Sequence, residues 1–225
     1  MSPSVFYHEH PYDIFIPDGT TKIIVGTLPP PRFSIKKLKE KDVNFCYGSC
    51  DGMLWPVLDE IFQLSLRFDN SIEAIKQRKT FLRQQRIGIC DIVASCTRQK
   101  IDASDIGMYN IRLRNILYQL GQHRYLRTII FTGGNSKNGP EYLFRKQLKE
   151  HGLQLICTHD TILRRHTFSY CEKEITTIAL TSPSNAANRA IGSTAHYKAQ
   201  KVANPKYTTF DFRVEQYRQV FLSRQ

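Results

Sequence analysis

Two aspartates carry the side chains best suited to acid–base chemistry in this chain of 225 residues. Asp91 lies inside the apolar run of residues 89–93, where a carboxylate either faces a polar cavity or bears the cost of desolvation. It could accept hydrogen bonds from the N–H groups of a ligand, hold a loop through backbone amides, or be neutralised by Arg98. Asp51 precedes a predicted helix, so it either activates water or caps that helix. A capping role would lower its pKa and make it a poor base.

Four apolar runs, each predicted to be a strand, carry polar or turn-forming residues near their ends. Residues 22–26 lead into Thr27-Leu28-Pro29-Pro30-Pro31, residues 128–131 into Thr132-Gly133-Gly134-Asn135, and residues 175–180 into Thr181-Ser182-Pro183-Ser184-Asn185, while residues 87–93 contain Asp91. Parallel strands of an α/β sheet end at the same edge, which is where such folds bind ligands. The four loops therefore predict one pocket.

Amphipathic segments separate these strands and predict the helices that flank them. We expect helices over residues 54–62, 72–82, 106–120, 140–152 and 212–222, the first capped by Asp51 and the third by Ser104 or Asp105. Residues 153–157 are predicted to be a further strand, and residues 159–173 a basic excursion that could form a β-hairpin. This alternation predicts an α/β fold: a three-layer α/β/α sandwich with a central, mainly parallel sheet of four or slightly more strands, in a single domain over residues 1–225.

The charge balance favours a polyanionic partner. The chain has 32 Lys and Arg against 20 Asp and Glu, a net charge of +12, which favours nucleic acid, although a charge surplus for solubility would give the same composition. No apolar stretch has the length of a membrane span and no signal peptide is evident, so we expect a cytoplasmic protein, nucleoid-associated if bacterial, without a membrane partner. The six cysteines form no CxxC pair, so we expect reduced thiols, no metal cluster and no cofactor.

Five segments, in order, resemble motifs of the uracil-DNA glycosylase superfamily, closest to its hypoxanthine-DNA glycosylase and mismatch-specific branches. They are IIVGTLP at residues 23–29, YGSCDGMLWPVL at 47–58, GICDIVASCTR at 88–98, the strand and glycine turn at 129–134, and LTSPSNAANR at 180–189. Their order and spacing carry the resemblance. It implies a uracil-DNA glycosylase-like fold and a base-excision repair enzyme. Such an enzyme flips a deaminated base, uracil or hypoxanthine, into a pocket and hydrolyses its N-glycosidic bond without a metal.

The resemblance and the residue types together suggest roles for the loops. The residues expected to take part in catalysis are Asp51, Gly26 and Thr27. The residues expected to contact the base are Leu28, Tyr47, Asp91, Thr132 and Gly133, with Tyr47, Phe45 or Phe33 able to stack on it and Trp55 placed in the core. The residues expected to contact DNA are Ser182, Pro183, Ser184, Asn185, Asn188 and Arg189. The Ser and Asn side chains of this loop can equally cap a helix that starts at residue 186, and both roles are compatible. The expected partner is damaged DNA, single- or double-stranded, bound by a monomer.

Gly52 departs from the pattern of the hypoxanthine branch. It stands three residues before Trp55, where that branch carries an Asn that resembles its water-positioning residue. Either Asp51 takes this role or hydrolysis is lost, so the alternative is a non-hydrolytic member that recognises damaged DNA. A third interpretation is an unrelated α/β enzyme acting on a nucleotide or a phosphorylated metabolite. The lack of GxxxxGK[ST] and GxGxxG motifs disfavours nucleoside triphosphates and dinucleotides as its substrates.

Overall fold

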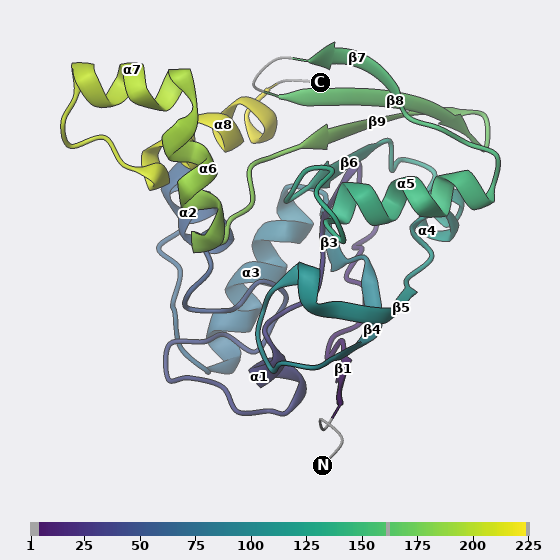
Figure 1. The fold of residues 1–225 in the computed structure, drawn as a ribbon, viewed down its shortest axis with the longest axis horizontal. Helices are drawn as coiled ribbons and strands as arrows, with labels where there is room; N and C mark the ends of the chain where they lie inside the picture. Colours follow the sequence, from purple (N-terminus) through teal and green to yellow (C-terminus); the bar gives the residue numbers. More distant parts are fainter. Residues whose placement is uncertain (1–4, 161–162, 224–225) are drawn as a thin grey trace.

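A six-stranded sheet forms the centre of the fold in the computed structural model, which describes residues 5–160 and 163–223 (Figure 1). Its strand order is β3-β2-β6-β9-β8-β7. Four neighbouring strands are parallel: β2 (Lys22–Gly26), β3 (Ile87–Asp91), β6 (Thr128–Phe131) and β9 (Lys173–Ala179). The antiparallel strands β8 (Arg164–Tyr170) and β7 (Ile156–Asp160) extend this sheet, as the hairpin expected from the basic excursion. The predicted mainly parallel sheet is confirmed.

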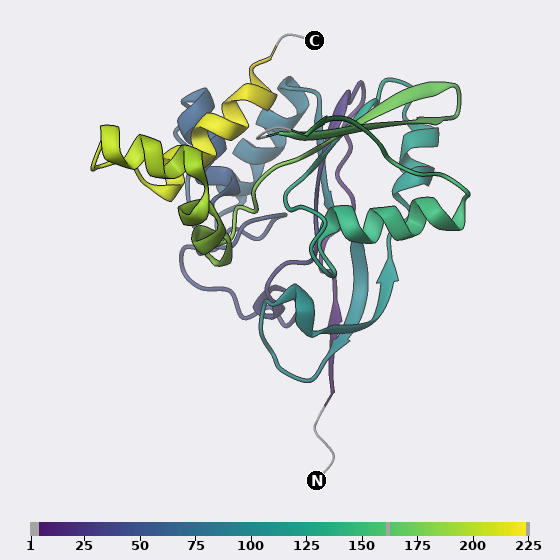
Figure 2. The ribbon, with the colours of Figure 1, turned by 45° about the horizontal axis from the view of Figure 1, so that its top comes forward.

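Helices cover both faces of the sheet, which gives the three layers expected from the sequence (Figure 2). One face packs against α2 (Leu54–Phe62), α3 (Ile72–Gln84) and α8 (Thr209–Phe221), and the other against α4 (Ile116–Gln122) and α5 (Pro140–Glu150). Strand β2 supplies both cores because its side chains alternate. Ile24 joins the core under α2, and Ile23 and Val25 join the core under α4 and α5.

A second, smaller sheet continues from the carboxyl end of β3. Its antiparallel strands have the order β1-β4-β5, with β1 (Phe6–Glu9), β4 (Val93–Arg98) and β5 (Met108–Leu113). The amide of Ile92, between β3 and β4, donates to the carbonyl of Gly26 at 2.9 Å, so the small sheet starts beside the end of β2. Helix α1 (Pro31–Ser34) follows the proline loop after β2.

The prediction of a single helix over residues 106–120 is wrong. The segment forms a short 3₁₀ turn, η1 (Asp105–Gly107), then strand β5, and only its last part is helical as α4. The apolar residues fit a helical spacing, but Ile106 and Tyr109 are exposed, and pairing with β4 determines the conformation. The cap of α4 is Asn115, whose side chain accepts the amide of Tyr118 at 2.8 Å.

The remaining helices agree with the sequence patterns more closely. Helix α3 begins after the cap Ser71, α5 begins at Pro140, and α8 begins with a capping box formed by Thr208 and Asp211. The strand expected at residues 153–157 begins three residues later, at Ile156. After β9 the chain forms η2 (Asn185–Ala187), α6 (Asn188–Ser193) and α7 (Ala195–Ala203), and the side chain of Ser184 accepts the amide of Ala186 as expected of a cap.

Candidate functional site

The carboxyl ends of the four parallel strands meet at one edge, as the loop pattern predicts. In the strand register Gly26 lies opposite Asp91, and Phe131 lies opposite Val25 and Ala179. The residue after β6, Thr132, donates its amide to the carbonyl of Val25 at 3.0 Å. The loops that leave β2, β3 and β6 are therefore held together by backbone hydrogen bonds at this edge.

Four predicted site residues make mutual contacts here, and we call Gly26, Tyr47, Asp91 and Thr132 the edge cluster. A Cβ atom at Gly26 would collide with the hydroxyl of Tyr47 and a carboxylate oxygen of Asp91, so only glycine fits there. The Tyr47 hydroxyl lies 2.9 Å from Oγ1 of Thr132. Burial raises the pKa of Tyr47 well above its ordinary value, so the phenol stays neutral and can donate a hydrogen bond. Tyr47 has a φ of 57°, a left-handed conformation that aims this side chain from a tight loop.

His10 completes the surroundings of Asp91, and no pattern in the sequence indicated it. Its Nε2 lies 2.8 Å from Oδ2 of Asp91, and both side chains are buried. Nδ1 of the same ring lies 2.9 Å from the carbonyl of Tyr12, so the ring is held at both nitrogens. Pairing of β1 with β4 brings this residue to the edge from 81 positions away. A buried carboxylate with such a partner meets the requirement that buried charges be paired.

Arg98 does not neutralise Asp91, contrary to one of the alternatives that the sequence allowed. Its Nε donates to Nδ1 of His8 at 2.9 Å and its Nη1 donates to the carbonyl of Ser104 at 2.5 Å. Its nearest carboxylate partner is Asp102, at 3.7 Å. Arg98 thus holds the loop between β4 and β5 against β1.

A second carboxylate, Asp105, lies against the loop after β2. Oγ1 of Thr27 donates to its Oδ2 at 3.2 Å, and the side chain of Asn138 donates to its backbone carbonyl at 3.0 Å. Burial raises the pKa of Asp105 to about 6, against the lowering effect of the Thr27 hydrogen bond. The sequence suggested only a helix cap for Asp105, because the contact with Thr27 crosses 78 positions.

Asp51 stands outside this constellation and is not a cap. Helix α2 has Met53 as its N-cap, without a side-chain hydrogen bond, since the turn at residues 49–52 carries Asp51 away from the first helical amides. The exposed Asp51 carboxylate accepts from Nζ of Lys39 at 2.8 Å and from Nη2 of Arg32 at 3.1 Å. These two cations, the Lys39 hydrogen bond first, hold the pKa of Asp51 below its ordinary value.

The loop after β9 packs directly on the loop that carries Asp51. The amide of Met53 donates to the carbonyl of Pro183 at 2.8 Å, Gly52 forms an isolated bridge with Ser184, and Nδ2 of Asn185 reaches the carbonyl of Asp51 at 3.5 Å. The structure therefore places most of the predicted DNA-contacting residues in one stretch beside Gly52.

Arg213 of α8 holds the loop from Ser182 to Asn185, which we call the closing loop. The sequence did not indicate this role of Arg213. Its guanidinium donates to the carbonyl of Ser182 at 3.0 Å and to the carbonyl of Ser184 at 2.8 Å, and the side chain is 1% exposed. Farther along, Nδ2 of Asn188 lies 3.4 Å from Oδ1 of Asn185, and Arg189 is exposed at the start of α6. Arg213 lies in an amphipathic helix, and its position in that pattern does not show that it bonds to a loop about 30 residues earlier in the chain.

Several other predicted residues have structural partners. Leu28 packs against the core under α4 and α5, and a Cβ at Gly133 would lie 3.0 Å from Cδ of Pro140, so neither joins the edge cluster. Phe33, Phe45 and Trp55 are buried in the core, as expected for Trp55 but against stacking on a base for the other two. Among the basic residues of the excursion, Arg164 pairs with Glu141 at 3.1 Å and His166 is buried beside Arg145, while Lys201 of α7 donates to two backbone carbonyls.

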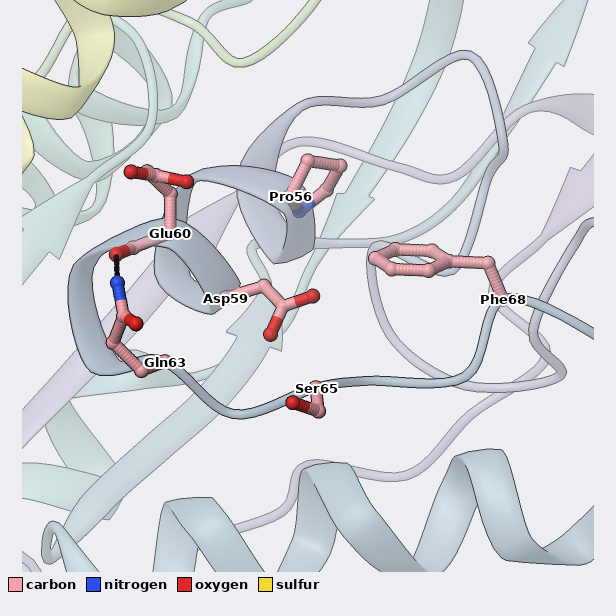
Figure 3. Close-up of a pocket in the computed structure, with 6 residues that line it drawn as sticks. All are labelled: Pro56, Asp59, Glu60, Gln63, Ser65 and Phe68. Carbon is pink, nitrogen blue, oxygen red and sulfur yellow. Dashed lines mark hydrogen bonds between the residues drawn. The ribbon is translucent and has the colours of Figure 1, made fainter.

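Two depressions in the surface are formed by the described residues. The one in Figure 3 has a volume of about 440 Å³ and is lined by α2 and the loop after it, through Pro56, Asp59, Glu60, Gln63, Ser65 and Phe68. Here Asp59 accepts the amide of Leu66 at 3.2 Å, a contact that stabilises the loop. The other, of about 470 Å³, has His10, Tyr12, Arg112 and Arg114 among its lining residues and so adjoins the His10–Asp91 pair.

Within residues 5–160 and 163–223, no group of three or more His, Cys, Asp or Glu side chains is arranged to hold a metal ion. In the same part of the chain, no helix is long and apolar enough to cross a membrane.

No protein-family model matches the sequence, and no curated protein matches it. Among solved structures, the fold is similar to the solution NMR structure of a "putative Uracil DNA glycosylase" from Methanosarcina acetivorans. The likeness covers 93% of this chain and 99% of that chain, with a TM-score of 0.51 and 15% sequence identity. Identity at this level establishes the fold, so the chemistry has to be argued from the site.

Proposed function

We propose that this protein is a DNA glycosylase that flips a deaminated base, uracil or hypoxanthine, out of DNA and hydrolyses its N-glycosidic bond without a metal. The observation that carries the proposal is the edge cluster with its His10–Asp91 pair, at the ligand-binding edge of a fold similar to that of the archaeal protein. The net charge of +12 suits a polyanionic partner.

The edge cluster offers groups suited to a flipped base. Asp91 can accept hydrogen bonds from the N–H edge of the base, and of the two hydroxyls of Tyr47 and Thr132, which share one hydrogen bond, the other proton can be donated to a carbonyl oxygen of the base. Negative charge near the sugar would stabilise an oxocarbenium-like transition state. The closing loop, from Ser182 to Asn185, and the exposed Arg189 supply hydroxyl, amide and guanidinium groups for phosphates.

Base release from labelled oligonucleotides tests the proposal. Single- and double-stranded substrates with uracil, hypoxanthine, xanthine or a G·T mismatch are treated with the protein and then with alkali, which cleaves abasic sites. We expect release of one base, and a loss of about 10- to 100-fold in Asp91→Asn, the range for a hydrogen bond to a charged group. The exposed Asp18→Asn variant is the matched control and should behave as wild type. Absence of release from every substrate contradicts the proposal.

A second candidate function is non-hydrolytic recognition of damaged DNA. It is favoured by the residues at positions 51 and 52. Asp51 is paired with two cations, and Gly52 has no side chain to position water. In that case the wild type binds DNA without releasing a base, and Gly52→Asn should raise base release. A Cβ at Gly52 would lie 3.2 Å from the carbonyl oxygen of Ser49, so the variant needs only a small local shift. A silent Gly52→Asn variant beside an active wild type would show that the alignment with the hypoxanthine branch is wrong at this position.

A further inference from the structure

Three carboxylates flank the candidate site, and their surroundings differ. Asp51 is exposed and paired with Lys39 and Arg32, which stabilise its ionised form and weaken it as a base. Asp91 is committed by one oxygen to His10 and lies in contact with Gly26 through the other. The two cations beside Asp51 make it a weak base, and Asp91 is the group proposed above to accept the N–H edge of the base, so a third carboxylate is better suited to take a proton from water.

Of these three carboxylates, Asp105 is the one with no ion-pair partner among the described residues. Its only recorded side-chain hydrogen bond in that part of the chain is the one from Thr27 to Oδ2, which leaves Oδ1 available. Asn138, which is 5% exposed, holds the backbone of Asp105 through the carbonyl and also donates to the carbonyl of Met108 at 3.3 Å. The carboxylate is thus fixed beside Thr27, the residue that follows Gly26 of the edge cluster.

We propose that Asp105 is the general base that takes a proton from the attacking water, an inference that rests on the proposed glycosylase function. The water oxygen forms a bond to C1′ of the flipped nucleotide while the C1′–N bond breaks. The electron pair of the C1′–N bond leaves with the base. One water proton passes to Oδ1 of Asp105, which later returns it to the departed base or to solvent. Water is the only co-reactant, so the step balances.

The groups that face Asp105 set the expected pH dependence. Arg98 of β4 and the Thr27 hydroxyl favour the ionised carboxylate, while burial and Asp91 of β3 disfavour it. Because burial dominates, the rate of base release should rise with pH around 6 and level off above pH 7, where Asp105 is ionised. An ordinary exposed carboxylate would give a level profile over this range.

The decisive variant is Asp105→Asn, whose amide oxygen can still accept from Thr27. We expect single-turnover base release at saturating DNA to fall by about 100-fold or more, with the Kd for DNA within about threefold of wild type. Asp102→Asn, in the same loop, is the matched control and should retain its rate. Release above about a third of the wild-type rate in Asp105→Asn, or an equal loss in both variants, overturns the inference and leaves the glycosylase proposal standing. A wild type that releases no base overturns both.

Thr27→Val gives a second measurement that does not depend on the folding of Asp105→Asn. It removes the hydrogen bond that lowers the pKa of Asp105, so the midpoint of the pH–rate profile should move upward. A merely structural role of Asp105 would lower the rate at all pH values without moving the midpoint. A midpoint unchanged from wild type overturns the inference.

Discussion

Gly26 is the residue on which the packing of the candidate site depends. It has no Cβ, and the space that a Cβ would take holds the Tyr47 hydroxyl and an Asp91 oxygen. We therefore expect Gly26→Ala to lower the free energy of unfolding by about 1–3 kcal/mol, the range for overpacking, and to suppress base release. Denaturant unfolding and the oligonucleotide assay measure the two effects.

Two further variants show whether this loss comes from the predicted collision. Gly192→Ala lies in α6 with nothing within 4 Å of the added Cβ, so it should keep or slightly raise the stability. Gly26→Ala combined with Tyr47→Phe removes the colliding hydroxyl and should recover part of the lost stability, since the two sites are in contact. Equal stability of Gly26→Ala and wild type would mean that the edge cluster is not packed as described.

At this scale the sequence brought the edge cluster together but did not indicate its partners. Gly26, Asp91 and Thr132 could be placed because each lies at or next to the end of a recognisable strand, and register alone brings strand ends together. His10 and Asp105 could not, because their contacts cross 81 and 78 positions through the small antiparallel sheet. Asp51 attracted attention by its place before a helix, while its two cationic partners lie 12 and 19 positions away in a loop without periodicity.

At the scale of elements, α8 connects the core to the closing loop through Arg213. Replacing this side chain by Met keeps its apolar stem, removes the donor of the Ser182 carbonyl and leaves the Ser184 carbonyl with the amide of Ala187 alone. We expect a loss of stability of about 1–3 kcal/mol, the range for hydrogen bonds lost from a charged donor, together with weaker DNA binding. Hydrogen exchange of the Met53 amide, which is bonded to Pro183, should become faster.

The exposed Arg218 on the same helix provides the control for Arg213. Arg218→Met removes the same charge and should leave stability, exchange and DNA affinity near their wild-type values. If Arg213→Met bound DNA as tightly as wild type, the order of the closing loop would have no part in recognition.

Element prediction succeeded where local pattern and tertiary contacts agree. Helices α3, α5 and α8 carry their own caps or start signals, and each of the four parallel strands supplies apolar side chains to the cores on both faces of the sheet. Residues 106–120 mislead because exposed apolar side chains on β5 imitate a helical stripe. Pairing with β4, which no local pattern reveals, makes the first half of this segment a strand and leaves α4 short.

At the scale of the whole molecule, the net charge of +12 predicts that DNA affinity depends on salt concentration. If the closing loop and the start of α6 meet phosphates, the logarithm of the binding constant should fall linearly with the logarithm of salt concentration. Arg189→Ala should weaken binding and reduce the steepness of that line by about one, the effect of one lost phosphate contact. Fluorescence anisotropy with a labelled oligonucleotide at several salt concentrations measures both quantities.

Lys149→Ala separates a local contact from the effect of total charge. Lys149 lies in the last turn of α5, whose first residue, Pro140, packs on Gly133 at the carboxyl edge, so the helix carries Lys149 toward the opposite edge. Both variants lose one positive charge, but only Arg189→Ala should change the slope. Equal changes of the slope in the two variants would mean that DNA affinity depends on the total charge of the molecule and not on docking at the carboxyl edge. An unchanged slope in Arg189→Ala alone would remove α6 from the DNA interface and leave the closing loop as the remaining contact.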